Sequence, residues 1–179
     1  MPYDVQYNQK ESNEESIMEI YKLKTAWYTI TGPFCLGCIL GGTTKSRIKV
    51  YEKILTNIGI AFQIKDDIIG IYGDSNYIGK STNSDISEFK QTILYSYIYN
   101  YNKKYLKELN KYYGKKDLND KEISRVKEIF IESNALEYAN KKMEELFDES
   151  IQKIAELNIN EKYKNIFIGF INYLKIRKK

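Results

Sequence analysis

Two adjacent carboxylates, Asp66 and Asp67, are the side chains in this sequence best suited to chemistry. A helix over residues 51–71 would gather them with other small or polar residues in one stripe of about 100°. The members of this stripe are Gly59, Gln63, Asp66, Asp67 and Gly70. The rest of the helix is mostly apolar, so the stripe should face a polar cavity. Adjacent buried carboxylates repel each other, so a cation is their natural partner there.

The composition narrows the possible chemistry. The chain has 179 residues and no histidine, which excludes Ser-His and Cys-His nucleophiles, histidine metal sites and histidine acid-base catalysis. The net charge is +4, with 28 basic and 24 acidic residues mixed along the chain, so no nucleic-acid surface is indicated. Any reaction must therefore depend on carboxylates, lysines, hydroxyls and a metal ion.

Neither the cysteines nor the chain start indicates another function. Cys35 and Cys38 have no second ligand pair to complete a zinc site and lack the βαβ context of a redox pair, so we interpret them as packing residues. The first residues carry no signal segment, and the longest apolar run, around 33–40, is too short to span a bilayer. A soluble, cytoplasmic protein without a transmembrane segment is predicted.

Helical periodicity runs along the whole chain. A first helix is predicted from Ser12, which forms a capping-box spacing with Glu15, to a kink or break at Gly32-Pro33. Further helices are predicted up to about residue 40, over 51–71, from 85 to near 114, and from about 119, 134 and 160, with 177–179 as a solvated basic end. No segment has the alternation of a strand, so the fold class is all-α. The segment 73–84 is predicted to be a long, functional loop.

Several short motifs follow one another in the first half of the chain. They are Lys24-Thr25-Ala26-Trp27-Tyr28 before Gly32-Pro33, Phe62-Gln63-x-x-Asp66-Asp67, Gly79-Lys80, Ser84-Asp85-Ile86, and Lys90 with Thr92. Over about 90 residues they resemble the Lys-Thr element, the second aspartate-rich motif and the following loop of the trans-isoprenyl diphosphate synthase (polyprenyl synthetase) family. Asp4-Val5 is similar to the end of an earlier family element.

The resemblance implies a helical bundle of the isoprenoid synthase type and a magnesium-dependent prenyl transfer. In that reaction an allylic diphosphate ionises, isopentenyl diphosphate attacks the carbocation, and a proton leaves with the diphosphate. Diphosphate departs readily only when its charge is neutralised, which Mg²⁺ and lysine donors can do. Magnesium prefers few carboxylates together with waters and phosphate oxygens, which suits one aspartate pair.

The resemblance also implies a role for each site residue. Asp66 and Asp67 would hold the magnesium ion, with Asp66 as the more direct ligand. Lys24, Lys80 and Lys90 would bind diphosphate oxygens. Thr25 and Gln63 would point oxygens at the allylic cation, and Tyr28 would line the same stripe as Lys24.

Two departures from the family pattern matter. The second motif usually ends in a third aspartate, where this chain has Gly70, and no Asp-Asp pair exists that could form the first aspartate-rich motif. We therefore expect 1–179 to be a single partial domain, about the C-terminal half of a synthase. It could be a split fragment or subunit that needs a protein partner with the first motif, or it could form a homo-oligomer. The alternatives are an inactive truncated homologue and a non-catalytic regulatory subunit of a full-length synthase.

Overall fold

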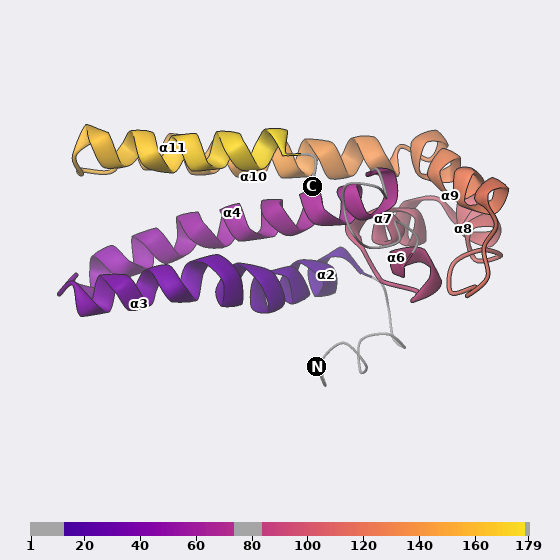
Figure 1. The fold of residues 1–179 in the computed structure, drawn as a ribbon, viewed down its shortest axis with the longest axis horizontal. Helices are drawn as coiled ribbons and strands as arrows, with labels where there is room; N and C mark the ends of the chain where they lie inside the picture. The colour runs from indigo at the N-terminus through magenta and orange to yellow at the C-terminus, as the bar shows by residue number, and fades with distance from the viewer. Residues whose placement is uncertain (1–12, 74–83, 178–179) are drawn as a thin grey trace. The chain divides into compact units, whose positions relative to one another are not determined.

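The computed structural model describes residues 13–73 and 84–177, and every regular element in these ranges is a helix (Figure 1). The predicted all-α fold class is therefore confirmed. The helices are α2 (Glu14–Tyr21), η1 (Lys22–Thr31), α3 (Gly32–Leu40), α4 (Lys45–Tyr72), α6 (Ser84–Ser87), α7 (Ile93–Tyr101), α8 (Lys103–Leu109), α9 (Asp120–Glu132), α10 (Ala135–Ala155) and α11 (Glu161–Ile176). Asp4, Lys80 and most of the predicted functional loop lie outside the described residues.

The chain divides into two compact units. Among the described residues, the first unit contains 13–17, 66–73 and 84–140, and the second contains 18–65 and 141–177. Helices α2, α4 and α10 contribute residues to both units.

The central helix α4 is longer than predicted, because it begins at Lys45 rather than near residue 51. The apolar positions on one face are buried, as the periodicity predicts, whereas Ile60, Phe62, Ile68 and Ile69 are only partly buried. The most deeply buried are Ile54, Leu55, Ile58, Ala61, Ile64 and Ile71. The stripe of small and polar residues that interrupts these apolar positions also reaches the interior, since Gly59 and Asp67 are both buried.

In the second unit, α4 packs antiparallel to η1 on one side and to α10 on another. The hydroxyl of Thr31 lies 3.5 Å from that of Thr56, and Asn57 Nδ2 donates to Glu149 Oε2 at 3.1 Å. Helix α11 then returns along α10 (Figure 1), where Lys175 Nζ lies 2.9 Å from Asp148 Oδ1. These layers bury the apolar faces of the helices against one another.

The segment before Pro33 is a π-helix rather than a broken α-helix. The Gly32 N–H donates to the carbonyl of Trp27, five residues earlier, and an added Cβ at position 32 would lie 2.7 Å from that oxygen. The predicted break at Gly32-Pro33 is thus wrong, because the chain remains helical through both residues. The wider turns accommodate a proline ring that has no N–H to donate.

In the first unit, the predicted single helix from 85 to near 114 is three helices, α6, α7 and α8. Thr92 has an extended backbone and caps α7, with its Oγ1 accepting from the Tyr95 N–H at 3.4 Å. Asn102 leaves helical geometry between α7 and α8. Apolar periodicity continues across both breaks, which is why it predicts one helix where local capping produces three.

Later helix boundaries follow the sequence signals closely. Asn119 and Glu122 form a reciprocal capping box at the start of α9, with both hydrogen bonds at 3.0 Å. Asn134 has a φ of 64° between α9 and α10, and Asn160 caps α11 through the Lys162 N–H. These asparagines confirm the predicted starts near 119, 134 and 160, because asparagine favours N-caps and tolerates positive φ.

The start of α2 is capped by Asn13, whose Oδ1 accepts from the Ser16 N–H at 2.7 Å. The predicted cap, Ser12, lies outside the described residues. The helix boundary near this position is confirmed, and the described capping hydrogen bond comes from the neighbouring asparagine.

Candidate functional site

Thr25 and Gln63, which the resemblance assigns to one site, contact each other in the second unit. The Thr25 hydroxyl donates a hydrogen bond to the side-chain carbonyl oxygen of Gln63, 38 residues later in the chain. The contact is possible because α4 approaches η1 very closely one turn earlier. An added Cβ at Gly59 would overlap the Cα and Cβ of Ala26. Glycine and alanine therefore set the spacing that brings the two polar side chains together.

Lys24 and Tyr28 are both exposed on η1, while Thr25 between them is buried. A lysine and a tyrosine on the exposed side of this π-helix could reach a bound anion, whereas Thr25 is buried beside Gln63. The roles implied for Lys24 and Tyr28 remain predictions.

Asp67 and Lys90 meet in the first unit, although 23 residues separate them in the sequence. The Lys90 ammonium lies 3.0 Å from Asp67 Oδ1 and 2.9 Å from Asp85 Oδ2. The Asp67 side chain is fully buried, and the Lys90 side chain is 34% exposed. A buried carboxylate is costly unless it is paired and hydrogen-bonded, so Lys90 is the partner that makes the burial of Asp67 tolerable.

The Lys90 pKa is shifted by this environment. Burial alone lowers the pKa, because it disfavours the charged form, but the attraction of Asp67 and Asp85 and their hydrogen bonds outweigh burial and raise the pKa above its ordinary value. Lys90 is therefore a permanent cation at physiological pH. A fixed positive charge is what binding a phosphate oxygen requires.

The turn that carries Lys90 is unusually constrained. Phe89 has a φ of 54°, a left-handed conformation that is rare for a bulky residue. The Phe89 N–H donates to Ile86 O at 3.2 Å and the Lys90 N–H to Asp85 O at 2.9 Å, which together form a Schellman motif after α6. The Lys90 carbonyl in turn accepts from the Tyr113 hydroxyl at 3.2 Å.

An aromatic cluster of Phe89, Tyr95 and Tyr113 packs against this turn. The ring of Phe89 lies 5.3 Å from that of Tyr95 and 5.6 Å from that of Tyr113, and Tyr95 and Tyr113 stack at 5.0 Å. Such ring pairs contribute about 0.5–1.5 kcal/mol each beyond the area they bury. The packing therefore offsets the strain of the left-handed Phe89 backbone.

Asp66 is half-buried, one residue before Asp67 on α4. Within the described residues, no group of three or more Asp, Glu or Cys side chains is arranged to hold a metal ion. The donors here still suit magnesium, which is usually bound through one or two carboxylates and keeps several waters. The metal assignment of Asp66 and Asp67 remains a prediction.

The side chain of Arg177 lies against an aromatic ring, which differs from the sequence-based prediction. We predicted a solvated basic end, but the guanidinium of Arg177 stacks over the ring of Phe62, 4.1 Å from its centroid, and burial lowers the Arg177 pKa. Phe62 directly precedes Gln63 in the second aspartate-rich motif. The sequence contains one signal for this contact, the aromatic residue Phe62 beside the polar Gln63, because arginine stacks favourably on aromatic rings.

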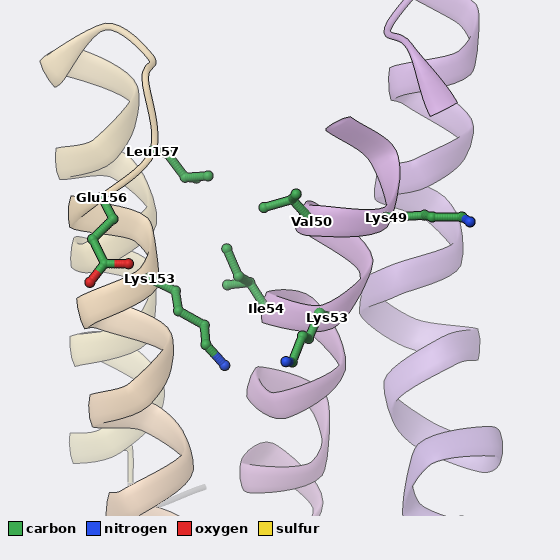
Figure 2. A pocket seen from close by; sticks show the side chains of 7 residues that line it. All are labelled: Lys49, Val50, Lys53, Ile54, Lys153, Glu156 and Leu157. Atoms are coloured by element: carbon green, nitrogen blue, oxygen red, sulfur yellow. The ribbon is translucent and has the colours of Figure 1, made fainter. Parts of the chain in front are cut away.

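A surface pocket of about 410 Å³ lies elsewhere in the second unit and contains none of the predicted site residues. Its lining residues are Lys49, Val50, Lys53, Ile54, Lys153, Glu156 and Leu157. Figure 2 shows Val50, Ile54 and Leu157 pointing into the gap between α4 and the end of α10, whereas Lys49 points away. The ammonium of Lys153 is already paired with Glu149. This pocket is therefore a weaker candidate than the motif residues.

No helix in the described ranges is long and apolar enough to cross a membrane. This result agrees with the absence of a transmembrane segment predicted from the sequence.

Comparison with known proteins gives a consistent result. The family model for polyprenyl synthetase matches residues 2–130. A geranylgeranyl diphosphate synthase of Saccharolobus solfataricus is 29% identical over 173 residues, which cover 96% of this chain and 52% of that relative. Among solved structures, a geranylgeranyl pyrophosphate synthase superposes with a TM-score of 0.89 at 24% identity. The match covers 99% of this chain and 56% of the chain of that synthase.

Another solved structure is the Corynebacterium glutamicum geranylgeranyl pyrophosphate synthase complexed with isoprenyl diphosphate and magnesium. It has a TM-score of 0.85 at 23% identity, and the match covers 98% of this chain and 49% of that protein. The likeness to these structures confirms the isoprenoid synthase fold. The chain spans about half the length of the relatives that it matches.

Proposed function

Because this chain belongs to the polyprenyl synthetase family, we propose that it contributes one wall of the active site of a magnesium-dependent isoprenyl diphosphate synthase. The reaction is the condensation of isopentenyl diphosphate with an allylic diphosphate. The observation that carries the proposal is the ion pair between the buried Asp67 and the partly exposed Lys90, at 3.0 Å. It fixes a cation against Asp67, which follows Asp66 in the motif that the resemblance assigns to the metal-diphosphate group.

Each residue of this wall has a proposed task. Asp66 is the direct magnesium ligand, and Asp67 supports the site while it accepts from Lys90. The magnesium ion, when bound, neutralises the charge that develops on the departing diphosphate. Lys90 and Lys24, with Lys80 from outside the described residues, donate to diphosphate oxygens. Thr25 and Gln63 present oxygen dipoles to the allylic cation, and Tyr28 lines the substrate path.

The opposing carboxylates are proposed to come from a protein partner that carries the first aspartate-rich motif. Two exposed apolar faces in the second unit support this proposal. One consists of Leu23, Trp27, Leu36, Ile39 and Leu40 on η1 and α3, and the other of Tyr163, Ile166, Phe170, Tyr173 and Ile176 on α11. Extended exposed apolar surfaces of this kind mark interaction sites. A cytoplasmic location stays a prediction from the sequence.

The test is a reconstitution. The purified chain is incubated with labelled isopentenyl diphosphate, an allylic diphosphate and magnesium, alone and with a separately purified N-terminal synthase half that carries Asp-Asp-x-x-Asp. We expect no product from the chain alone and magnesium-dependent product from the mixture. Chelation of magnesium should remove the activity, and Asp66→Ala should abolish it.

Three results would contradict the proposal. Product from the isolated chain would overturn the need for a partner. A mixture that binds as a complex but forms no product would favour the non-catalytic regulatory subunit, and a chain that fails to bind any synthase partner would favour the inactive homologue.

A further inference from the structure

Lys90 is fixed at three separate points. Its backbone N–H donates to Asp85 O, its carbonyl accepts from Tyr113, and its ammonium contacts both Asp67 and Asp85. Fixing both the main chain and the side-chain end of one residue is typical of a functional group that must be positioned in advance.

The two carboxylates lie deeper than the lysine that they hold. The Asp67 side chain is fully buried and that of Asp85 is 16% exposed, whereas the Lys90 side chain is 34% exposed. An ammonium group has three N–H donors. Two of them serve Asp67 and Asp85, and among the described residues no further acceptor of the ammonium is found, so the third can serve an acceptor from outside, such as a phosphate oxygen.

Gly70 provides the space for this arrangement. An added Cβ at position 70 would lie 2.8 Å from Asp85 Oδ2 and 3.5 Å from Asp85 Cγ. Real Cβ atoms do not approach a carboxylate oxygen so closely, so any side chain at position 70 would displace Asp85. A side chain at position 70 would therefore require the Asp85 carboxylate to leave the position in which it contacts Lys90.

We propose that Gly70 and Asp85 form a positioning pair for Lys90, in which the missing side chain at position 70 admits the Asp85 carboxylate that holds the ammonium toward a bound diphosphate. This inference rests on the proposed function for its ligand. Asp85 is a positioning residue that acts through Lys90.

The first test is a double-mutant cycle on the full chain, with Gly70→Ala, Asp85→Ala and the double variant compared by urea unfolding. Gly70→Ala should lower the unfolding stability when Asp85 is present, by at least about tenfold in the equilibrium constant, because the methyl group displaces a charge-assisted hydrogen bond. When position 85 is alanine, the same change should be neutral or stabilising, as alanine is in an open helix. Gly37→Ala is the matched control, since nothing lies within 4 Å of its added Cβ.

The second test measures how fast Lys90 reacts with an amine-reactive ester, read by mass spectrometry against the exposed Lys116 of the same molecule. Asp85→Ala and Gly70→Ala should each raise the Lys90 rate roughly tenfold, because the amine loses a charged partner. Asp117→Asn, a change at an exposed aspartate, should leave the rate unchanged. Magnesium with inorganic diphosphate should protect Lys90 in the wild type and protect it much less in Asp85→Ala.

The outcomes separate the two proposals. Additive free energies in the cycle, or an unchanged Lys90 rate in both variants, would overturn the positioning pair. If diphosphate does not protect Lys90 in the wild type, or protects it equally well in Asp85→Ala, Asp85 does not hold the ammonium toward a bound diphosphate. If the double-mutant cycle shows coupling and diphosphate protects Lys90, but the reconstituted mixture forms no product, only the proposed function is refuted. Neither the unfolding measurement nor the labelling of Lys90 requires turnover.

Discussion

Gly59 of α4 lies directly against Ala26 of η1, so closely that a methyl group at position 59 would overlap the Ala26 backbone. Both residues are buried. This contact is one turn away from the hydrogen bond between Thr25 and Gln63. Glycine at position 59 therefore allows the close helix approach that brings Thr25 and Gln63 within hydrogen-bonding distance.

We predict that Gly59→Ala destabilises the protein, although alanine is the better helix former. The added methyl group must push η1 away from α4, and such overpacking costs about 1–3 kcal/mol. Urea unfolding followed by circular dichroism measures the change. Gly169→Ala on α11 is the control, because its added Cβ meets nothing within 4 Å and should stabilise by up to about 1 kcal/mol. A Gly59→Ala protein as stable as this control would show that the helices separate at no cost.

A second prediction concerns the hydroxyl of Thr25. Thr25→Val keeps the shape of the side chain but removes the hydrogen bond to Gln63. The expected loss is about 1 kcal/mol of unfolding free energy, the usual net value of a neutral hydrogen bond. Thr25→Ser keeps the hydroxyl and should retain more of the stability, and in the reconstituted assay it should retain more activity than Thr25→Val. Equal activity of the valine and serine variants would contradict a role for this hydroxyl.

Much of this architecture is predictable because its causes are local. The starts of α9, α10 and α11 follow from Asn119, Asn134 and Asn160, whose side chains or backbone preferences act within a few residues. The buried face of α4 follows from its apolar spacing. Motif resemblance also named Asp67 and Lys90 as members of one site, and they form an ion pair.

The remaining features depend on contacts between distant segments. The role of Gly70 becomes visible only when Asp85 is found where its Cβ would be. The left-handed Phe89 contradicts ordinary residue preferences and is tolerated because Tyr95 and Tyr113 pack against its ring. Arg177 stacks on Phe62, far from it in the sequence. Sequence periodicity contains no information about such pairings.

A third prediction follows from the burial of Tyr113. Burial raises the pKa of this phenol above its ordinary value of 10.0, so the folded protein keeps the proton at pH values where the unfolded chain loses it. Unfolding stability should therefore fall as the pH rises above about 10, by at most about 1.4 kcal/mol per pH unit for this group. Tyr113→Phe should make the alkaline slope shallower, measured by urea unfolding between pH 9 and 11.

The control for this experiment is Tyr101→Phe, because the ring of Tyr101 is 68% exposed. Burial also raises the pKa of Tyr72, whose hydroxyl donates to Lys127 O at 2.8 Å, so Tyr72→Phe should reduce the slope in the same direction. An alkaline slope that is identical in wild type and Tyr113→Phe would refute the assignment.

The last prediction separates the two adjacent aspartates by their tasks. Asp67 is fully buried and paired with Lys90, so Asp67→Asn should cost roughly 1–3 kcal/mol of unfolding free energy, because it weakens a charged hydrogen bond and leaves Lys90 with one carboxylate. Asp66 is half-buried on the same helix, and Asp66→Asn should change the stability by less than about 0.5 kcal/mol. In the reconstituted assay Asp66→Asn should nevertheless be the more damaging change, and added magnesium should recover part of its activity. Equal losses of stability in the two variants would contradict the division of tasks between the two aspartates. A response to magnesium only in Asp67→Asn would make Asp67 the metal ligand.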